Sequence, residues 1–271
     1  MNQEVAALCR RIRDLTPASV ERPTLVYFDI IGIAWPIRCL LHLAAVDHEL
    51  VQISIFQWFE RDEQGRQALK GVFTNGHVPL YVDEEVSLNQ SQIILTYLAE
   101  RHGMDGQTAR ERLAVREVMA HAYDALFHCN GMLSVTIRNG LSDEIAEARL
   151  GAFLGEGEWP LVSDGYDNHL RGFDRYLSAN PASSGFFVGH SLTVADLHAF
   201  NVLCNWYKAF SPARFVEDYP RLEDFIQRIA AIPGVTDYIT HEQEPTTWFP
   251  LPTVAMRLTS PAELEGLTAA R

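Results

Sequence analysis

One short stretch limits most strongly what this chain of 271 residues can fold into. It runs from Val78-Pro79, through the acidic residues 83–85, to Gln90-Ser91. The pattern predicts a short strand that opens with Val78-Pro79, a tight turn, a second short strand, and a helix that begins at Ser91. Because proline gives a ladder no N–H donor, we expect the Pro79 strand to lie at an edge of its sheet.

The same stretch also predicts a ligand. If the Val78-Pro79 bond is cis, the Val78 N–H and C=O turn outward, and an extended peptide can pair with them as an added strand. About a dozen residues later, the Ser91 hydroxyl and the free N–H groups of the helix start form a carboxylate site. The two features together predict a small, acidic, peptide-like ligand.

This stretch resembles the glutathione site of the cytosolic glutathione transferases, in which a Val/Ile/Leu-Pro strand precedes a Gln/Glu-Ser pair at a helix start. The resemblance extends from about Thr24 to about Ile239. It includes a capping box in which Thr193 is the cap and Asp196 bonds back to it. It implies an α/β N-terminal thioredoxin-like domain and an all-α C-terminal helical domain.

The chain is long enough for two modest domains. Strands are predicted at 24–28 and 50–56 and helices at 37–45, 62–70 and 91–101, an order typical of a thioredoxin-like domain. The apolar spacing of residues 1–15 predicts a short amphipathic helix packed on the body. We expect an N-terminal helical extension at 1–22, a thioredoxin-like glutathione-binding domain at 23–102, an all-helical domain at 108–240 and a C-terminal tail at 241–271.

Composition excludes several classes of function. The net charge of −13 argues against a nucleic-acid partner, which requires a basic surface. No apolar run is long enough to span a bilayer, and the first residues have no signal-peptide pattern, so no membrane association is expected. The cysteines lie far apart without C-x-x-C or zinc spacing, which predicts reduced thiols, no metal and a cytoplasmic protein.

Tyr27 is the candidate catalytic residue, since it ends the first predicted strand just ahead of a turn that contains Gly32 and Pro36. A lone tyrosine there is more often an ordinary strand aromatic. The resemblance is to the tyrosine-type classes (alpha, mu, pi and sigma), nearest the sigma class, and it implies a phenol that hydrogen-bonds the glutathione thiolate. Because a free thiol has a pKa near 8.5, a hydrogen bond that favours the anion would lower that pKa and activate the sulfur.

The resemblance also assigns the groups that hold glutathione. Lys70 would bind its glycine carboxylate, and Arg66 either binds the same carboxylate or is a solvated surface charge. The cysteinyl backbone and the γ-glutamyl end would be held by Val78, Pro79, Gln90 and Ser91.

Asp124 matches an aspartate that crosses the interface of a C2 homodimer to reach the ligand of the partner subunit. Its alternative is an ordinary exposed acid on a helix. The pocket for the second substrate is predicted to contain Phe28, Ile33, His198 and Trp248.

One departure from the pattern concerns thiol activation. Sigma-like members often have Arg-Ala-Glu where this chain has Ile33-Ala34-Trp35, so a charge beside the thiolate is replaced by an apolar side chain. The leading hypothesis is a glutathione transferase acting on an apolar electrophile, with glutathione as co-substrate and no bound cofactor. Two alternatives stay open: a glutathione-dependent isomerase of the prostaglandin type, and a non-catalytic binding or interaction module.

Overall fold

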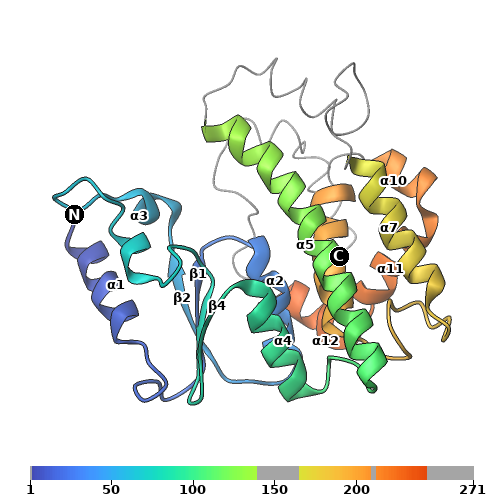
Figure 1. Ribbon diagram of the computed structural model, residues 1–271, viewed down its shortest axis with the longest axis horizontal. Coiled ribbons are helices and arrows are strands. Elements are labelled where there is room, and N and C mark those ends of the chain that lie inside the picture. Colours follow the sequence, from blue (N-terminus) through green and yellow to red (C-terminus); the bar gives the residue numbers. More distant parts are fainter. Residues whose placement is uncertain (1, 139–164, 209–211, 243–271) are drawn as a thin grey trace. The chain divides into compact units, whose positions relative to one another are not determined.

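The computed structural model describes residues 2–138, 165–208 and 212–242 (Figure 1). The chain divides into two compact units. Unit 1 contains residues 2–102 and 237–242, and unit 2 contains the described residues between 103 and 236. None of the helices described is both long and apolar enough to cross a bilayer. Trp248 and the rest of the predicted C-terminal tail lie outside the described residues.

Unit 1 is built on a four-stranded mixed sheet in the order β2-β1-β3-β4. The strand β1 runs parallel to β2 and antiparallel to β3, and β3 runs antiparallel to β4. This is the thioredoxin-like arrangement that the sequence predicts. The strands are β1 (Thr24–Phe28), β2 (Glu49–Ile53), β3 (Leu80–Val82) and β4 (Ser87–Asn89).

The strand that follows Pro79 is internal, so the expectation of an edge strand is wrong. It lies between β1 and β4, and its ladder begins at Leu80, which pairs with Val26 and Asn89. Pro79 therefore stands one residue before the ladder, where no N–H donor is missing. The Val78-Pro79 bond is cis, which is the condition considered for an outward-facing Val78.

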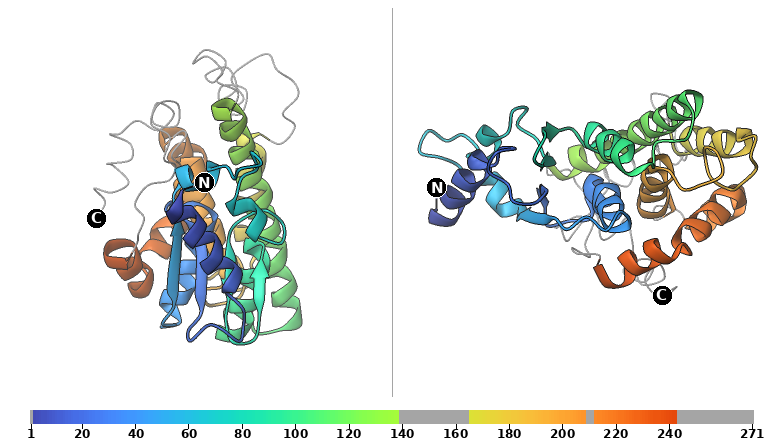
Figure 2. Two further views of the ribbon diagram at one scale, coloured as in Figure 1. Left: turned by 90° about the vertical axis from the view of Figure 1, so that its left-hand side faces the viewer. Right: turned by 90° about the horizontal axis from the view of Figure 1, so that it is seen from below.

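Helices cover both faces of this sheet (Figure 2). On one face α2 and α4 pack against each other, and Pro36 stands near the start of α2 as predicted. The helical segments of unit 1 are α1 (Gln3–Asp14), η1 (Gly32–Ala34), α2 (Trp35–Leu43), α3 (Ile55–Phe59), η2 (Leu69–Val72), α4 (Ser91–His102) and η4 (Tyr238–Glu242).

The amphipathic helix predicted at the N-terminus is confirmed as α1. Asn2 caps it by accepting a hydrogen bond of 2.8 Å from the Val5 N–H. Its apolar stripe, Val5, Cys9 and Ile12, is at most 3% exposed and joins one core cluster with residues of β1, β2 and η2. Burying this stripe makes α1 part of the domain core.

The helix predicted at 62–70 is wrong, and the second strand is shorter than predicted. Asp62 accepts backbone N–H bonds from Gln64 and Arg66, both at 2.9 Å, and a bridge pairs Arg61 with Gln67. An aspartate that binds its own neighbouring backbone in this way competes with helix formation. A capping box between Ser54 and Gln57 starts α3 where the strand was expected to continue.

Unit 2 is helical, with α8 at its centre. All nine residues of α8 are buried, and α5 packs along it. The capping box predicted at its start is confirmed, since Asp196 accepts hydrogen bonds from the Thr193 N–H at 2.8 Å and hydroxyl at 2.7 Å. The elements are α5 (Ala109–Arg138), α7 (Tyr166–Ala179), α8 (Val194–Val202), η3 (Leu203–Tyr207), α10 (Pro212–Asp218), α11 (Pro220–Ala230) and α12 (Pro233–Asp237).

Candidate active site

The sheet register brings Tyr27, the segment 78–79 and the segment 90–91 to one end of the sheet. Tyr27 lies at the carboxyl end of β1, and Val26 pairs with Leu80 at the start of β3. Leu80 in turn pairs with Asn89 at the end of β4. The segments 78–79 and 90–91 therefore flank the end of β1 that carries Tyr27.

Tyr27 packs tightly against the turn that follows its strand. The side chain is 4% exposed, and its hydroxyl oxygen accepts a hydrogen bond of 3.1 Å from the Ile33 N–H. A Cβ atom placed on Gly32, whose φ is +45°, would lie 2.4 Å from that same oxygen. Only glycine suits this left-handed position and leaves room for the hydroxyl.

Arg38 on α2 holds the segment between Tyr27 and this turn. It is 3% exposed and donates hydrogen bonds to the carbonyl oxygens of Ile30 at 3.2 Å and Ile31 at 2.9 Å. Its Nε also donates to the Tyr238 hydroxyl at 3.3 Å. By fixing Ile30 and Ile31, Arg38 fixes the approach to the turn from which the Ile33 N–H reaches Tyr27.

The phenol of Tyr27 holds its proton at neutral pH, as any tyrosine does, and burial strengthens that hold. Burial raises the pKa of Tyr27 to about 12, and the Ile33 N–H and the positive charge of Arg38 only partly oppose this. At neutral pH the hydroxyl therefore keeps its proton while its oxygen accepts from Ile33. Such a group is suited to donate a hydrogen bond to an anion rather than to act as a base.

An aromatic cluster extends from Tyr27 toward Lys70. Phe28 packs edge-on against Trp58 with ring centroids 5.1 Å apart, and Trp58 lies 5.8 Å from Phe73. The Lys70 ammonium lies 5.8 Å from the centre of the Trp58 ring. No role was predicted for Trp58 from the sequence. Of the three aromatic residues between 55 and 59 it is the buried one, since Phe56 is 81% and Phe59 52% exposed.

Arg66 takes part in a surface ion pair. Its side chain is 75% exposed and its Nε donates to Asp62 at 3.0 Å, while Nη2 donates to Gln64 at 3.2 Å. Of the two alternatives for Arg66, this geometry favours the surface charge. A contact with a glutathione carboxylate stays a prediction.

Asn89 stabilises the corner that precedes β3. No role was predicted for this residue from the sequence. Its side-chain amide donates to the Pro79 carbonyl at 3.1 Å and to the His77 carbonyl at 3.4 Å. Val78 lies within this corner and is 9% exposed. The signal in the sequence was an asparagine that directly precedes the Gln-Ser pair.

The Gln90-Ser91 pair forms a strained entry to α4. Gln90 has a φ of +77°, a left-handed conformation that is uncommon for a residue with a side chain, and its carbonyl accepts from the Ile94 N–H at 3.0 Å. Ser91, the first residue of α4, is 4% exposed. Strain of this kind is concentrated at ligand-binding sites.

Two further predicted residues belong to unit 2, and one is outside the described residues. Asp124 is an exposed residue of α5 in unit 2, and Trp248 is outside the described residues. His198 is 1% exposed within α8, and burial lowers its pKa to about 4. His198 therefore belongs to the interior of unit 2 and is neutral at physiological pH, as an ordinary core histidine is.

Two sequence families match this chain. The glutathione S-transferase N-terminal domain matches residues 23–100, and the glutathione S-transferase C-terminal domain matches residues 160–242. Together they cover more than half of the chain. A curated relative, glutathione S-transferase 4 of Caenorhabditis elegans, is 25% identical over 81% of this chain and 96% of its own length.

Solved structures share the fold. One is the monomeric glutathione S-transferase Na-GST-3 of the hookworm Necator americanus, with a TM-score of 0.66 and 21% identity over 82% of this chain and 98% of that one. Another is prostaglandin synthase D of Nilaparvata lugens, with a TM-score of 0.61 and 19% identity over 83% of this chain and 100% of that one. With both sequence domains matched and the thioredoxin-like and helical units present, the chain belongs to the cytosolic glutathione transferase family.

Proposed function

We propose that this protein is a tyrosine-type glutathione transferase, nearest the sigma class, in which Tyr27 activates the thiol of glutathione. The observation that carries the proposal is the state of the Tyr27 hydroxyl. Its oxygen accepts the Ile33 N–H, and its raised pKa keeps its own proton in place. The phenol O–H is therefore left to donate to a thiolate, which lowers the pKa of the thiol.

Each of the three residues of glutathione would be bound by a different group of this chain. The backbone of Val78 would pair with the cysteinyl residue as an added strand. Ser91 and the first N–H groups of α4 would hold the α-carboxylate of the γ-glutamyl residue, where the helix dipole favours negative charge. Lys70, whose ammonium lies over Trp58, would bind the glycine carboxylate, with Arg66 as a second cation.

The reaction needs no other group from this chain for its bond changes. The glutathione thiol loses its proton to solvent, and the thiolate sulfur attacks an electrophilic carbon. A carbon–sulfur bond forms while the leaving group departs with its bonding electron pair. Tyr27 keeps its proton throughout and acts by stabilising the sulfur anion. Phe28 and Ile33 would supply the apolar contacts of the electrophile.

A homodimer would complete the site. Asp124, exposed on α5, would reach the α-amino group of glutathione bound to the partner subunit. One structural neighbour is described as monomeric, so the state of this chain must be measured. We expect sedimentation to give twice the chain mass of 30.5 kDa and Asp124→Asn to weaken glutathione binding. A monomer with full affinity for glutathione would contradict this role of Asp124.

A second candidate is a glutathione-dependent isomerase. It is favoured by the structural neighbour named prostaglandin synthase D. The two activities differ in what becomes of glutathione, because an isomerase returns it unchanged and a transferase consumes it. Glutathione consumption measured with an aryl halide and with an endoperoxide separates them.

The proposed function is tested by steady-state conjugation of glutathione to an aryl halide. Removing the Tyr27 hydroxyl (Tyr27→Phe) should lower kcat/KM by about 100-fold, the lower end of the cost of losing one donor to a developing or stabilised anion. A matched control, Tyr176→Phe, removes a hydroxyl that bonds Glu117 on the surface of unit 2 and should leave activity unchanged. Equal activity of wild type and Tyr27→Phe would contradict the proposal.

A further inference from the structure

A cavity of about 740 Å³ lies in unit 1 between α1 and the segment 62–71. One wall is a face of α1, a helix that precedes the matched N-terminal family domain, which begins at residue 23. The other wall is the turn and short helix around η2. The lining residues are Ala6, Cys9, Arg10, Arg13, Asp62, Gln64, Arg66, Gln67, Ala68, Lys70 and Gly71.

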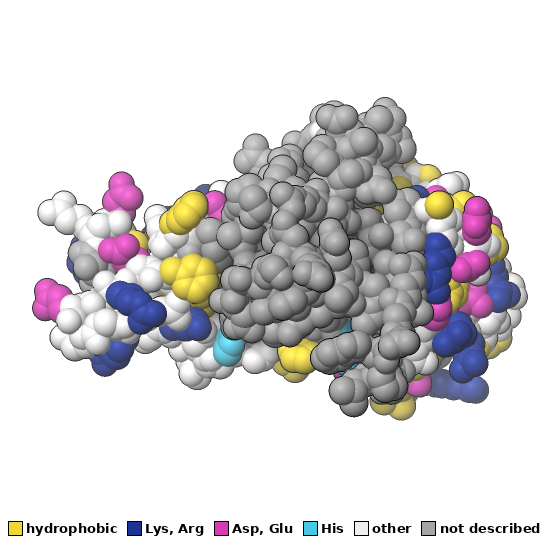
Figure 3. All heavy atoms as spheres, turned by 90° about the horizontal axis from the view of Figure 1, so that it is seen from above, with side chains coloured by type: hydrophobic (Ala, Val, Ile, Leu, Met, Phe, Trp, Pro, Cys, Tyr) yellow, Lys and Arg dark blue, Asp and Glu magenta, His cyan; other side chains and the backbone are white. Residues whose placement is uncertain are grey.

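The charges of this groove are strongly one-sided. Its described lining residues include four cationic side chains, Arg10, Arg13, Arg66 and Lys70, and one acid, Asp62. Such a grouping is notable in a chain whose net charge is −13. In the space-filling view, both Lys and Arg (dark blue) and Asp and Glu (magenta) side chains lie at this end of unit 1, so the excess of positive charge belongs to the groove and not to the whole end (Figure 3).

The carboxylate of Asp62 already has hydrogen-bond partners within the chain. Asp62 accepts from the Arg66 side chain and from the backbone N–H groups of Gln64 and Arg66, and these bonds lower its pKa. Among the described residues, no carboxylate forms an ion pair with Arg10, Arg13 or Lys70. These three positive charges are therefore available to an anion from outside the chain.

The remaining lining groups also suit an anion. Arg10 and Arg13 are three residues apart, so they are neighbours on the same face of α1. The side-chain amides of Gln64 and Gln67 add neutral donors on the opposite wall. Burial raises the pKa of Cys9, so its thiol adds no negative charge at neutral pH.

We propose that this groove binds a small polyanion that carries phosphate groups. Guanidinium groups match phosphate oxygens with paired hydrogen bonds, and a cleft lined by one sign of charge concentrates the opposite sign. Within the described part of the chain, no aromatic side chain lines the groove. It therefore recognises the phosphates rather than a base or ring attached to them.

The direct test is calorimetric titration of inorganic pyrophosphate into the full chain at low ionic strength. We expect saturable binding, weakened about tenfold or more in Arg10→Gln/Arg13→Gln, since the loss of even one bond to a charged group is worth about 1.5 kcal/mol or more. Both arginines are exposed, so this variant should keep its fold, which circular dichroism checks.

The control is Arg11→Gln, which removes one positive charge from α1 at a residue that pairs with Glu49 outside the groove; it is compared with the single variant Arg10→Gln as well as with the double variant. It should change pyrophosphate binding less than twofold. Absence of saturable binding to the wild type would overturn the proposal, and so would equal weakening by the control. Citrate that binds more tightly than pyrophosphate would overturn the assignment to phosphate.

One consequence rests on the proposed function, because Lys70 is also assigned to the glycine carboxylate of glutathione. Pyrophosphate should then raise the KM for glutathione and leave kcat unchanged, and Arg10→Gln/Arg13→Gln should lose this effect. Pyrophosphate binding in a protein that conjugates nothing would contradict the proposed transferase function and leave the groove in place.

Discussion

At the scale of single residues, Gly32 and Tyr27 depend on each other. A methyl group at Gly32 would lie 2.4 Å from the Tyr27 hydroxyl oxygen, and the φ of +45° adds strain for any side chain. We expect Gly32→Ala to lower the free energy of unfolding by about 2 kcal/mol or more and to lower activity by displacing the phenol.

Gly65→Ala is the matched control for this change. Its φ is +75°, but nothing lies within 4 Å of the added Cβ, so only the backbone cost of about 1 kcal/mol applies. Urea unfolding and conjugation rates of both variants separate backbone strain from the clash. Full activity in Gly32→Ala would show that the phenol does not depend on this turn.

A substitution at Gln90 should raise the stability of the protein and weaken its binding of glutathione. The left-handed backbone of Gln90 costs about 1 kcal/mol, which glycine would relieve. We expect Gln90→Gly to gain up to about 1 kcal/mol of stability, measured by urea unfolding, and to bind glutathione more weakly by calorimetry.

Ala45→Gly is the control for Gln90, because Ala45 also has a positive φ, of 52°, and no assigned role in binding. It should gain similar stability and keep its glutathione affinity. If the affinity is unchanged in Gln90→Gly as well, Gln90 is not part of the glutathione site.

At the scale of elements, α1 is a structural member of the thioredoxin-like unit. Ile12 is 2% exposed in its core cluster, so Ile12→Ala should cost about 2–4 kcal/mol of stability. Leu113→Ala, at a side chain that is 65% exposed, should cost little. Chemical unfolding of both variants checks this, and equal small losses would show that α1 is not packed on the core.

Helix α8 contains two buried groups whose pH effects oppose each other. Burial raises the pKa of Asp196 to about 6, so the folded state holds this proton more tightly, and stability falls as pH rises from about 4 to 6. Burial lowers the pKa of His198 to about 4, so the unfolded state binds this proton more tightly, and stability rises between pH 4 and 6.5.

Replacing His198 should leave the effect of Asp196 on the pH dependence of stability unopposed. In His198→Leu we expect the free energy of unfolding to fall by about 3 kcal/mol as pH rises from 4 to 6, at 1.36 kcal/mol per pKa unit of the Asp196 shift. In the wild type His198 opposes this change, so the free energy of unfolding should vary less with pH. Urea unfolding at several pH values measures this slope. Parallel pH curves for variant and wild type would contradict the opposing roles.

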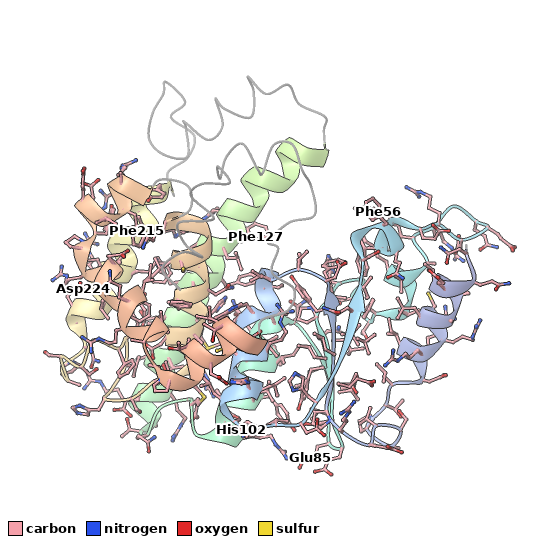
Figure 4. All side chains as sticks on the ribbon, turned by 180° about the vertical axis from the view of Figure 1, so that it is seen from behind. Phe56, Glu85, His102, Phe127, Phe215 and Asp224 are labelled. Carbon is pink, nitrogen blue, oxygen red and sulfur yellow. The ribbon has the colours of Figure 1, made fainter. Side chains whose placement is uncertain are left out.

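Local patterns predicted some elements and failed at others for physical reasons. The box of Thr193 and Asp196 and the helix at Ser91 depend on neighbouring residues, so the sequence contains their full signal. The helix predicted at 62–70 does not form because the Asp62 carboxylate accepts hydrogen bonds from nearby backbone N–H groups and so stabilises a turn. The labelled Phe56 lies on α3, 81% exposed, where the sequence predicted a longer strand (Figure 4).

At the scale of the whole molecule, the features that could not be predicted from the sequence depend on contacts between residues far apart in the chain. The sequence predicted which strands exist, but the central place of β3 follows from pairing with both β1 and β4 across the sheet. The same applies to Arg38, whose contacts with Ile30, Ile31 and Tyr238 span two distant parts of unit 1. The resemblance to a known family supplied the site residues that no local pattern could assign.

The central claim is that the neutral phenol of Tyr27 stabilises the glutathione thiolate. The most direct measurement is the thiol pKa of glutathione bound to the protein, from thiolate ultraviolet absorbance across pH. We predict a value about two units below that of free glutathione, equivalent to about 2.7 kcal/mol, and a return toward the free value in Tyr27→Phe. Bound glutathione with an unshifted thiol pKa, or a shift that survives in Tyr27→Phe, would contradict the account.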